Sequence, residues 1–188
     1  MNNKFDIQKA KKEDILQVYA LQKSKLLKSK STSENKSLSK EGFLVYELSV
    51  EDFSKALRCK NTFLLVAKSK EKVIGYFLAY TLKKYTKLHP EFLKEIKLTK
   101  EGTLDNQNII FGKQLVSDRS FPKIGESLNK ELFKIAREKE YSLYVCEILE
   151  GPLENKRSIE KHKSINLKRI GEHKDKKKYL WGIYSKKL

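Results

Sequence analysis

The sequence of 188 residues is poor in residues that cross-link, kink or break a chain. Its two cysteines, Cys59 and Cys146, are too few for a disulfide framework and lack the spacing of a metal site, so we expect reduced thiols and no metal. Only three prolines occur, and no linker separates two blocks of different composition. Because the length also suits one hydrophobic core, we predict a single domain over residues 1–188.

The sequence also lacks a long hydrophobic run. Its longest uncharged, apolar-rich stretch, residues 73–82, is about half of the roughly 20 residues that a membrane helix needs. The first residues lead directly into alternating polar and apolar positions, without the hydrophobic region of a secretory signal. We therefore expect a cytoplasmic protein that has no membrane partner.

Acidic residues are scarce relative to basic ones, 24 against 41, which gives a formal net charge of +17. Such a charge suits a nucleic-acid-binding protein, because phosphate neutralisation dominates that affinity. Arginine, which makes the bidentate contacts to bases and phosphates, occurs only five times, and the lysines are spread along the chain. We interpret most lysines as solvated surface and keep nucleic-acid binding as an alternative. The lysine-rich residues 173–178 are typical of a hairpin turn.

Hydrophobic periodicity predicts alternating strands and helices. Ser49 and Asp52 form a capping-box pattern before a short helix, and residues 28–41 are polar, which favours a mobile loop. The predicted strands lie at 5–8, 62–67, 73–82, 109–116, 141–148, 167–170 and 179–184. The other predicted helices lie at 13–27, at 91–98 in a charged insert, around 128–136 and at 155–163. The strand at 141–148 follows a helix, so we expect it to run parallel to the strand at 109–116.

A phosphate site is predicted where the long strand leads into the amphipathic helix. The first amides of a helix have no partners within it and carry partial positive charge, so they bind phosphate groups. Gly125 would let a phosphate approach the backbone closely, and Lys123 could add a point charge. A single glycine before a helix is also typical of an ordinary loop, and that interpretation stays open.

The segment after the next strand carries a more specific pattern. Asn155 is followed three residues later by Ser158 and four residues after that by His162. Asn166-Leu167 then occupies the position at which proteins with this pattern usually have a Gly-Phe pair. With this spacing and the order of elements, the sequence resembles the GNAT superfamily of N-acetyltransferases. The resemblance implies one α/β (α+β) domain with a mixed, mostly antiparallel central sheet of about six or seven strands flanked by helices. A splayed parallel strand pair would form the coenzyme cleft.

The resemblance implies acetyl-coenzyme A as cosubstrate. The main chain of Leu115, Val116 and Ser117 would pair with the pantetheine arm, as an added strand does. Asn155 and Ser158, one turn apart, would face the coenzyme. A helix N-cap at Asn155 with a solvated Ser158 is the alternative. The amides that would hold the pyrophosphate belong to Lys123, Ile124, Gly125, Glu126 and Ser127.

The resemblance further implies direct acetyl transfer to a primary amine. His162 occupies the place of a proton-transferring residue, since an imidazole can give or take a proton near neutral pH. Glu147, which we place near the end of its strand, could be the base, directly or through water. A histidine packed at a helix end and a surface carboxylate are the structural alternatives.

Several other side chains are interpreted as structural. Cys146 would lie on the opposite sheet face from Glu147, in the core, because neighbouring strand residues alternate in direction. Trp181, with Tyr179 and Ile183, alternates as a strand in the sheet core does. His89 and His173 are isolated in the sequence, and we expect both to be exposed.

Three functions remain in view. The first is an N-acetyltransferase that acts on an amine of an unidentified small molecule or protein. The second is a non-catalytic acyl-coenzyme A binding module on the same fold, and the third is a basic nucleic-acid-binding protein. The acceptor would enter beside residues 28–41, and the positive charge favours neutral or acidic acceptors over polyamines. The sequence suits a monomer or a homodimer equally well.

Overall fold

A computed structural model describes residues 4–27, 39–100, 102–104 and 108–188. Within it the chain forms two compact units. Unit 1 comprises Met1–Leu26, Leu44–Tyr80 and Gly112–Glu140, and unit 2 comprises Leu27–Phe43, Thr81–Phe111 and Tyr141–Leu188. The single domain expected from the sequence stays a prediction. The loop predicted at 28–41 falls largely outside the described residues.

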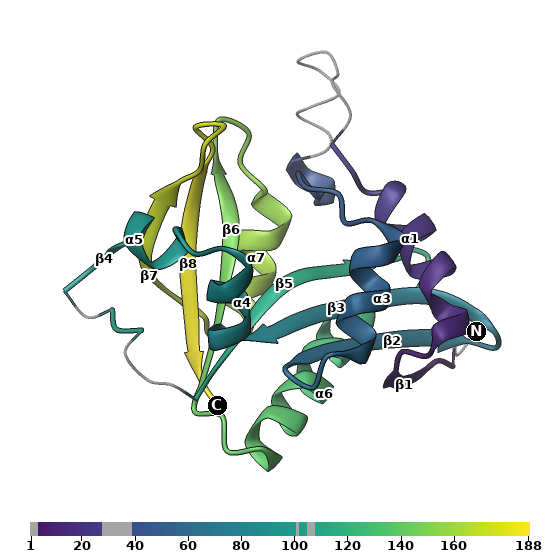
Figure 1. The fold of residues 1–188 in the computed structure, drawn as a ribbon. Helices are drawn as coiled ribbons and strands as arrows, with labels where there is room; N and C mark the ends of the chain where they lie inside the picture. The colour runs from purple at the N-terminus through teal and green to yellow at the C-terminus, as the bar shows by residue number, and fades with distance from the viewer. Residues whose placement is uncertain (1–3, 28–38, 101, 105–107) are drawn as a thin grey trace. The chain divides into compact units, whose positions relative to one another are not determined.

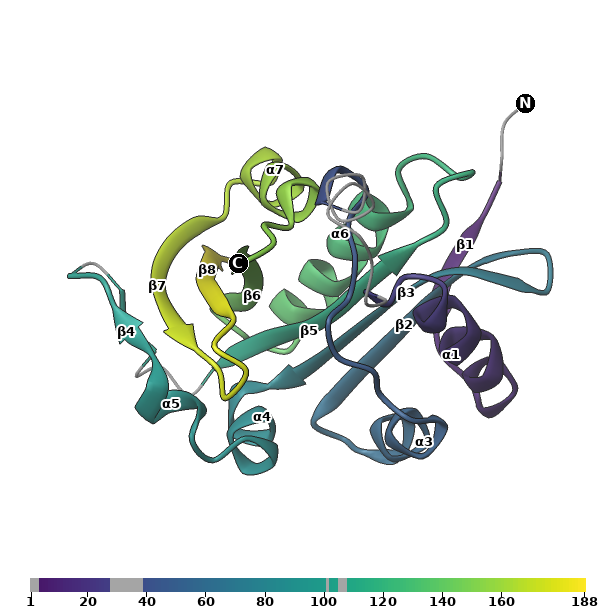
Figure 2. The same cartoon turned by 90° about the horizontal axis from the view of Figure 1, so that it is seen from above.

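Unit 1 is a sheet covered by helices on both faces. Its strands follow the order β1-β2-β3-β5, and β1 and β3 each pair with β2 in antiparallel fashion, which confirms the predicted hairpin. Helices α1 and α3 lie on one face and α6 lies on the other (Figures 1 and 2). The elements are β1 (Asp6–Lys9), η1 (Lys12–Asp14), α1 (Ile15–Lys23), α3 (Val50–Arg58), β2 (Thr62–Ser69), β3 (Lys72–Thr81), β5 (Ile109–Ser117) and α6 (Ile124–Glu138).

Helix α3 begins at the predicted capping box. The Asp52 amide donates to the Ser49 Oγ over 3.1 Å, and the Ser49 amide donates to the Asp52 carboxylate over 2.9 Å. The Ser49 hydroxyl donates to the same carboxylate over 2.8 Å. These hydrogen bonds lower the pKa of Asp52, and the bond from the Ser49 backbone amide contributes most. A helix of nine residues therefore starts at the residue that the sequence indicates.

We expect Ser49→Ala to lower the free energy of unfolding by about 1 kcal/mol at pH 7, because the substitution removes the hydroxyl that caps α3. A carboxyl whose pKa is lowered in the folded state stabilises the fold above its unfolded pKa of about 3.9, and that stability is lost as the pH falls through the folded value. The difference between variant and wild type should therefore shrink between pH 7 and pH 3. Urea unfolding at the two pH values measures it, with Ser54→Ala inside α3 as control. A difference that is constant with pH would contradict the expectation.

Helix α6 packs its apolar side against the sheet of unit 1. Ile124, Leu128, Leu132 and Ala136 recur at intervals of four residues, and all are buried. Gly75 on β3 makes the close packing possible: a Cβ built there would lie 2.5 Å from Ile124 Cγ2 and 3.3 Å from Leu128 Cδ1. The first turn of α6 is thus seated directly on the backbone of β3.

Unit 2 holds the remaining elements and the start of β5, Ile109–Phe111. Its strands follow the order β5-β6-β8-β7-β4, with antiparallel pairs at β6–β8, β8–β7 and β7–β4. Strands β5 and β6 begin side by side, since the Ser142 amide donates to the Asn108 carbonyl over 3.0 Å. The elements are α4 (Leu82–Leu88), α5 (Phe92–Glu95), β4 (Lys97–Leu98), β6 (Leu143–Gly151), α7 (Lys156–Ser164), β7 (Lys168–Lys174) and β8 (Leu180–Lys187).

The two faces of the unit 2 sheet carry different helices. Helices α4 and α5 lie on one face of β6, β8 and β7, and α7 lies on the other (Figures 1 and 2). Asn166, which follows α7, has a left-handed φ of 61°, as expected from its place in the Gly-Phe position. No helix among the described residues is both long and apolar enough to cross a bilayer.

Residues 82–98 differ from the prediction. A helix, α4, begins after Thr81, whose hydroxyl accepts from the Lys84 amide over 3.1 Å. The predicted helix at 91–98 is helical only over Phe92–Glu95, and Lys97–Leu98 then forms β4 on the edge of β7. This short edge strand gives eight strands in place of the predicted six or seven. Two residues of strand carry too little sequence pattern to be recognised, because only the pairing with β7 defines them.

The predicted hairpin turn at 173–178 is also shorter than expected. Strand β7 continues through Lys174, and the turn begins at Asp175, whose carboxylate accepts from the amides of Lys177 and Tyr179. The α/β class and the open mixed sheet flanked by helices are confirmed. The extension of β7 places His173 inside the sheet.

Candidate active site

The start of α6 presents the backbone amides of its first turn. Lys123 adopts a left-handed φ of 67°, and its carbonyl accepts the first helical bond, from the Ser127 amide, over 2.9 Å. The amides of Ile124, Gly125 and Glu126 therefore lack partners within the helix. The Ser127 amide, also predicted to hold the pyrophosphate, is engaged in the helix, and its contact with a coenzyme stays a prediction.

The surroundings of Gly125 leave space for a ligand. A Cβ built at this glycine would meet only Leu115 Cδ2, at 3.9 Å, so protein packing does not require a glycine here. The preceding loop is held by Asp118, whose carboxylate accepts from the Ser120 amide over 3.0 Å. That backbone hydrogen bond lowers the pKa of Asp118. The loop and helix start together fit a phosphate group, and their binding to one stays a prediction.

Asn155 forms the N-cap of α7. Its side-chain oxygen accepts from the Ser158 amide over 3.3 Å, and its side-chain nitrogen donates to the Phe43 carbonyl over 3.0 Å. The predicted N-cap at Asn155 is thus confirmed, whereas the solvated Ser158 of that alternative is not, and both polar groups of the Asn155 side chain make contacts within unit 2. Ser158 is half-buried. The contacts of Asn155 and Ser158 with a coenzyme stay a prediction.

His162 is a buried, neutral side chain. Its Nδ1 lies 2.6 Å from the Ser158 carbonyl, which can only accept, so Nδ1 carries the proton. Burial lowers the pKa of His162, which favours the neutral ring at pH 7. Its Nε2 is then a proton acceptor. A role as acid therefore requires a second proton on a buried ring, and the catalytic role of His162 stays a prediction.

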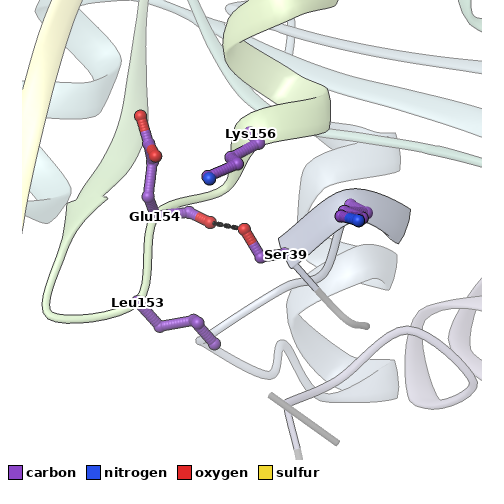
Figure 3. A pocket seen from close by; sticks show the side chains of 5 residues that line it. Ser39, Leu153, Glu154 and Lys156 are labelled. Carbon is purple, nitrogen blue, oxygen red and sulfur yellow. Dashed lines mark hydrogen bonds between the residues drawn. The ribbon is translucent and has the colours of Figure 1, made fainter. Parts of the chain in front are cut away.

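A cavity of about 320 Å³ lies at the start of α7 (Figure 3). The Ser39 hydroxyl donates a hydrogen bond to the Glu154 carbonyl across it. Ser39 and Lys40 come from the end of the segment that we associate with acceptor entry. The lining residues are Ser39, Lys40, Leu153, Glu154 and Lys156.

Glu147 is the best-defined chemical group in unit 2. It lies in the middle of β6, not near the end of its strand, because β6 continues to Gly151. Its side chain is only 11% exposed. The Tyr85 hydroxyl donates to Glu147 Oε2 over 3.0 Å, and His173 Nε2 forms a short hydrogen bond with Glu147 Oε1. A carboxylate held on both oxygens in this way is oriented, and its role as a base stays a prediction.

His173 is buried, which corrects the expectation that it is exposed. It is 7% exposed, and Phe92 packs edge-on against its ring with centroids 5.7 Å apart. His89 is exposed as expected, although its ring contacts that of Tyr85. Tyr85 in turn stacks on Phe111 at 3.8 Å. An aromatic cluster therefore surrounds the partners of Glu147.

The remaining structural interpretations hold with one exception. Cys146 is buried, and burial raises the pKa of its thiol to about 12, so it is not a nucleophile. Ile183 is fully buried, but Trp181 and Tyr179 are only half-buried. Trp181 Nε1 donates to the Asp175 carboxylate over 2.9 Å, which holds the indole at the turn. The sheet-core interpretation is thus wrong for Trp181 and Tyr179.

Sequence reasoning missed both partners of Glu147. Tyr85 lies on α4, where Leu82, Tyr85 and Leu88 recur every three residues behind a capping threonine, a pattern that was open to recognition. His173 lies in a lysine-rich stretch whose local pattern favours an exposed turn. Neither pattern points to Glu147, which lies 62 and 26 residues away in the chain.

Comparison with known proteins places this geometry in a fold. No protein-family model and no curated protein matches the sequence. Among solved structures, an N-acetyltransferase from Staphylococcus aureus Mu50 is 18% identical, with a TM-score of 0.64 and coverage of 98% of each chain. The PaiA N-acetyltransferase from Thermoplasma acidophilum, in complex with coenzyme A, is 15% identical, with a TM-score of 0.64 over 98% of this chain and 99% of that one.

A GNAT-family protein from Desulfovibrio desulfuricans is 11% identical, with a TM-score of 0.65 over 98% of this chain and 99% of that one. The chain has the GNAT fold. The resemblance found in the sequence is therefore confirmed at the level of the fold. Within the GNAT fold, the helix after the long strand is α6 and the helix with the Asn155 cap is α7.

Proposed function

We propose that this protein is a cytoplasmic N-acetyltransferase that moves an acetyl group from acetyl-coenzyme A to a primary amine. The observation that carries the proposal is Glu147, a largely buried carboxylate held by two donors, in a fold shared with N-acetyltransferases. A coenzyme A complex of one such structure supports the choice of cosubstrate.

The residues at the start of α6 fit coenzyme A. The first-turn amides of Ile124, Gly125 and Glu126 would hold the pyrophosphate, with the Lys123 ammonium as an added positive charge. The open space at Gly125 suits this contact, since a phosphate must approach the backbone closely. The main chain of residues 115–117 would pair with the pantetheine arm, and Asn155 and Ser158 would contribute from α7.

In the proposed reaction Glu147 takes the proton of the acceptor amine. Acetyl-coenzyme A, when bound, supplies the acetyl thioester that the amine attacks. Tyr85 and His173 contact different oxygens of the Glu147 carboxylate. They orient it and favour its charged form, which is the form that accepts a proton. His162 is the candidate for returning a proton to the departing thiolate, for which its Nε2 must first take up a proton, because the Nδ1 proton is bound to the Ser158 carbonyl.

A panel of primary amines, including small amines, amino acids and peptide N-termini, tests the proposal. Acetyl-coenzyme A and each amine are incubated with the protein, release of free thiol is followed by absorbance, and the acetylated product is identified by mass. We expect turnover with at least one amine, and faster turnover of neutral or acidic acceptors than of polyamines. Binding of coenzyme A without any turnover would instead support the non-catalytic module.

Nucleic-acid binding is tested separately. A mixed-sequence duplex should bind the protein with a steep dependence on salt if its charge serves phosphate neutralisation. We expect no such binding, because the lysines are spread along the chain. Tight, salt-sensitive binding together with the absence of acetyl transfer would overturn the proposed function.

We expect Lys123→Gly to weaken coenzyme A binding by about tenfold, or roughly 1.4 kcal/mol, because it removes a charge next to the phosphate site. The same substitution should raise the free energy of unfolding by about 1 kcal/mol, since glycine adopts the left-handed conformation of this position without steric cost. Calorimetric titration with coenzyme A and thermal unfolding measure the two effects.

Lys134 provides the controls, because it lies on the exposed side of α6 away from the first turn. Lys134→Gly and Lys134→Gln remove the same charge there, and only Lys134→Gly also introduces a glycine. Lys134→Gln should leave coenzyme A affinity unchanged, and Lys134→Gly should destabilise the helix. Unchanged coenzyme A affinity in Lys123→Gly would remove Lys123 from the site.

A further inference from the structure

We propose that His173 and Tyr85 are positioning residues for Glu147, a role that rests on the proposed function. Each donates to a different oxygen of the same carboxylate: His173 Nε2 to Oε1 and the Tyr85 hydroxyl to Oε2. A carboxylate fixed at both oxygens cannot rotate about its terminal bond without breaking a hydrogen bond. Its acceptor positions are therefore held toward one direction before an amine arrives.

The sheet register explains how His173 reaches Glu147. Glu147 is aligned with Ile183 on β8, and Ile183 is aligned with Gly171 on β7. His173 follows Gly171 by two residues, so its side chain projects from the same sheet face as that of Glu147. This face is the one that α4 and α5 cover (Figures 1 and 2).

The other nitrogen of His173 faces a second glutamate, Glu95. Nδ1 is buried, has no hydrogen-bond partner among the described residues, and lies 3.9 Å from Glu95 Oε2 on α5. The charged and titratable groups facing the imidazole are thus Glu147 from β6, Glu95 from α5 and, through Glu147, Tyr85 from α4. In the neutral ring the single proton lies on Nε2, where it is donated to Glu147. In the charged ring a second proton lies on Nδ1, on the side of Glu95. His173 therefore donates to Glu147 in both states.

Aromatic packing holds the two donors in place. The Tyr85 ring lies nearly parallel to Phe111, at an interplanar angle of 16°. Phe92 packs edge-on against Phe111 at 5.2 Å and against His173 at 5.7 Å. Helix α4 supplies Tyr85 and helix α5 supplies Phe92. Residues 82–98, which depart most from the sequence prediction, therefore provide one donor to Glu147 and the ring that packs on the other.

The test compares Tyr85→Phe, His173→Phe and His173→Gln, using acetyl-coenzyme A and the amine with the highest rate in the panel. We expect Tyr85→Phe and His173→Phe to lower kcat by about 10- to 100-fold, since a displaced catalytic group costs up to about that much, with KM for acetyl-coenzyme A unchanged. The acid limb of the pH profile should move to higher pH, because the charged carboxylate loses a donor. His173→Gln keeps an N–H donor and should retain kcat within about threefold.

Tyr184→Phe is the matched control. Its hydroxyl also donates to a glutamate, Glu150 Oε1, over 2.8 Å, but Tyr184 is aligned with Cys146 and not with Glu147. The Tyr184→Phe variant should lose a similar hydrogen bond to a glutamate without any change in the pH profile. The positioning role would be overturned if Tyr85→Phe and His173→Phe kept the wild-type pH profile. It would also be overturned if His173→Gln were as impaired as His173→Phe.

The outcomes also separate this role from the proposed function. If the wild-type protein transfers acetyl groups and Glu147→Gln does not, while Tyr85→Phe and His173→Phe behave as wild type, the positioning role alone fails. A readout without turnover is the imidazole N–H signal of His173 in proton NMR. It should be present in the wild type and in Tyr184→Phe and absent in Glu147→Leu, which has no acceptor, and its persistence in Glu147→Leu would overturn the assigned hydrogen bond.

Discussion

Replacement of Glu147 with glutamine is expected to slow acetyl transfer by a factor of about 10²–10⁴, the range that a well-placed general base contributes. Glutamine has nearly the same shape and can still accept from either Tyr85 or His173 through its one oxygen, but it cannot take the amine proton. The effect should fall on kcat, and the affinity for coenzyme A should not change, because the residues predicted to bind the coenzyme do not include Glu147. Initial rates over a range of acetyl-coenzyme A concentrations measure both quantities.

Glu150→Gln is the control for this experiment. Glu150 belongs to the same strand, β6, and its carboxylate accepts from Arg169 over 2.9 Å and from Tyr184 over 2.8 Å. Arg169 and Tyr184 lower the pKa of Glu150, although burial opposes them, so it is charged and bound at neutral pH. We expect Glu150→Gln to lower stability but to leave kcat close to wild type. Near-normal turnover by Glu147→Gln would exclude Glu147 as the base.

The largest effect on stability is expected from Gly75→Ala. The new methyl group would lie 2.5 Å from Ile124 Cγ2 and 3.2 Å from the Val116 carbonyl oxygen. Ile124 is buried at the first residue of α6, so it cannot swing away, and the helix must move off the sheet. Overpacking of this kind costs about 1–3 kcal/mol, which corresponds to about 2–4 °C in Tm for each kcal/mol in a chain of this size.

Thermal unfolding followed by circular dichroism measures the effect, and Gly125→Ala is the matched control. At Gly125 the added methyl would meet only Leu115 Cδ2 at an ordinary contact distance of 3.9 Å. Its Tm should not fall, since alanine favours a helix more than glycine does. A Gly75→Ala variant as stable as the wild type would show that α6 is not seated on β3 as described.

Local sequence patterns predicted most of unit 1. The capping box at Ser49, the hairpin of β2 and β3, and the apolar side of α6 depend on residues within a few positions of one another. Propensity and periodicity act over such distances, so the patterns are readable from the sequence. The left-handed conformation of Asn166 was predictable for the same reason, because it depends on the residue itself.

The partners of Glu147 were not predictable in this way. Residues 82–98 form two short helices and a two-residue strand whose boundaries depend on packing over β6 and β7. His173 belongs to a lysine-rich stretch, and the local pattern favoured an exposed turn. It is buried because β7 pairs with β8 through Lys174, a contact that local composition does not contain.

The sequence by itself determined the order of most elements, the fold class and the choice of Glu147 as a candidate base. The tertiary structure alone decided that Glu147 is held by Tyr85 from α4 and by His173 from β7. The physical reason is that capping and periodicity are encoded locally, whereas a carboxylate acquires its donors from strands and helices that only sheet register and helix packing bring together.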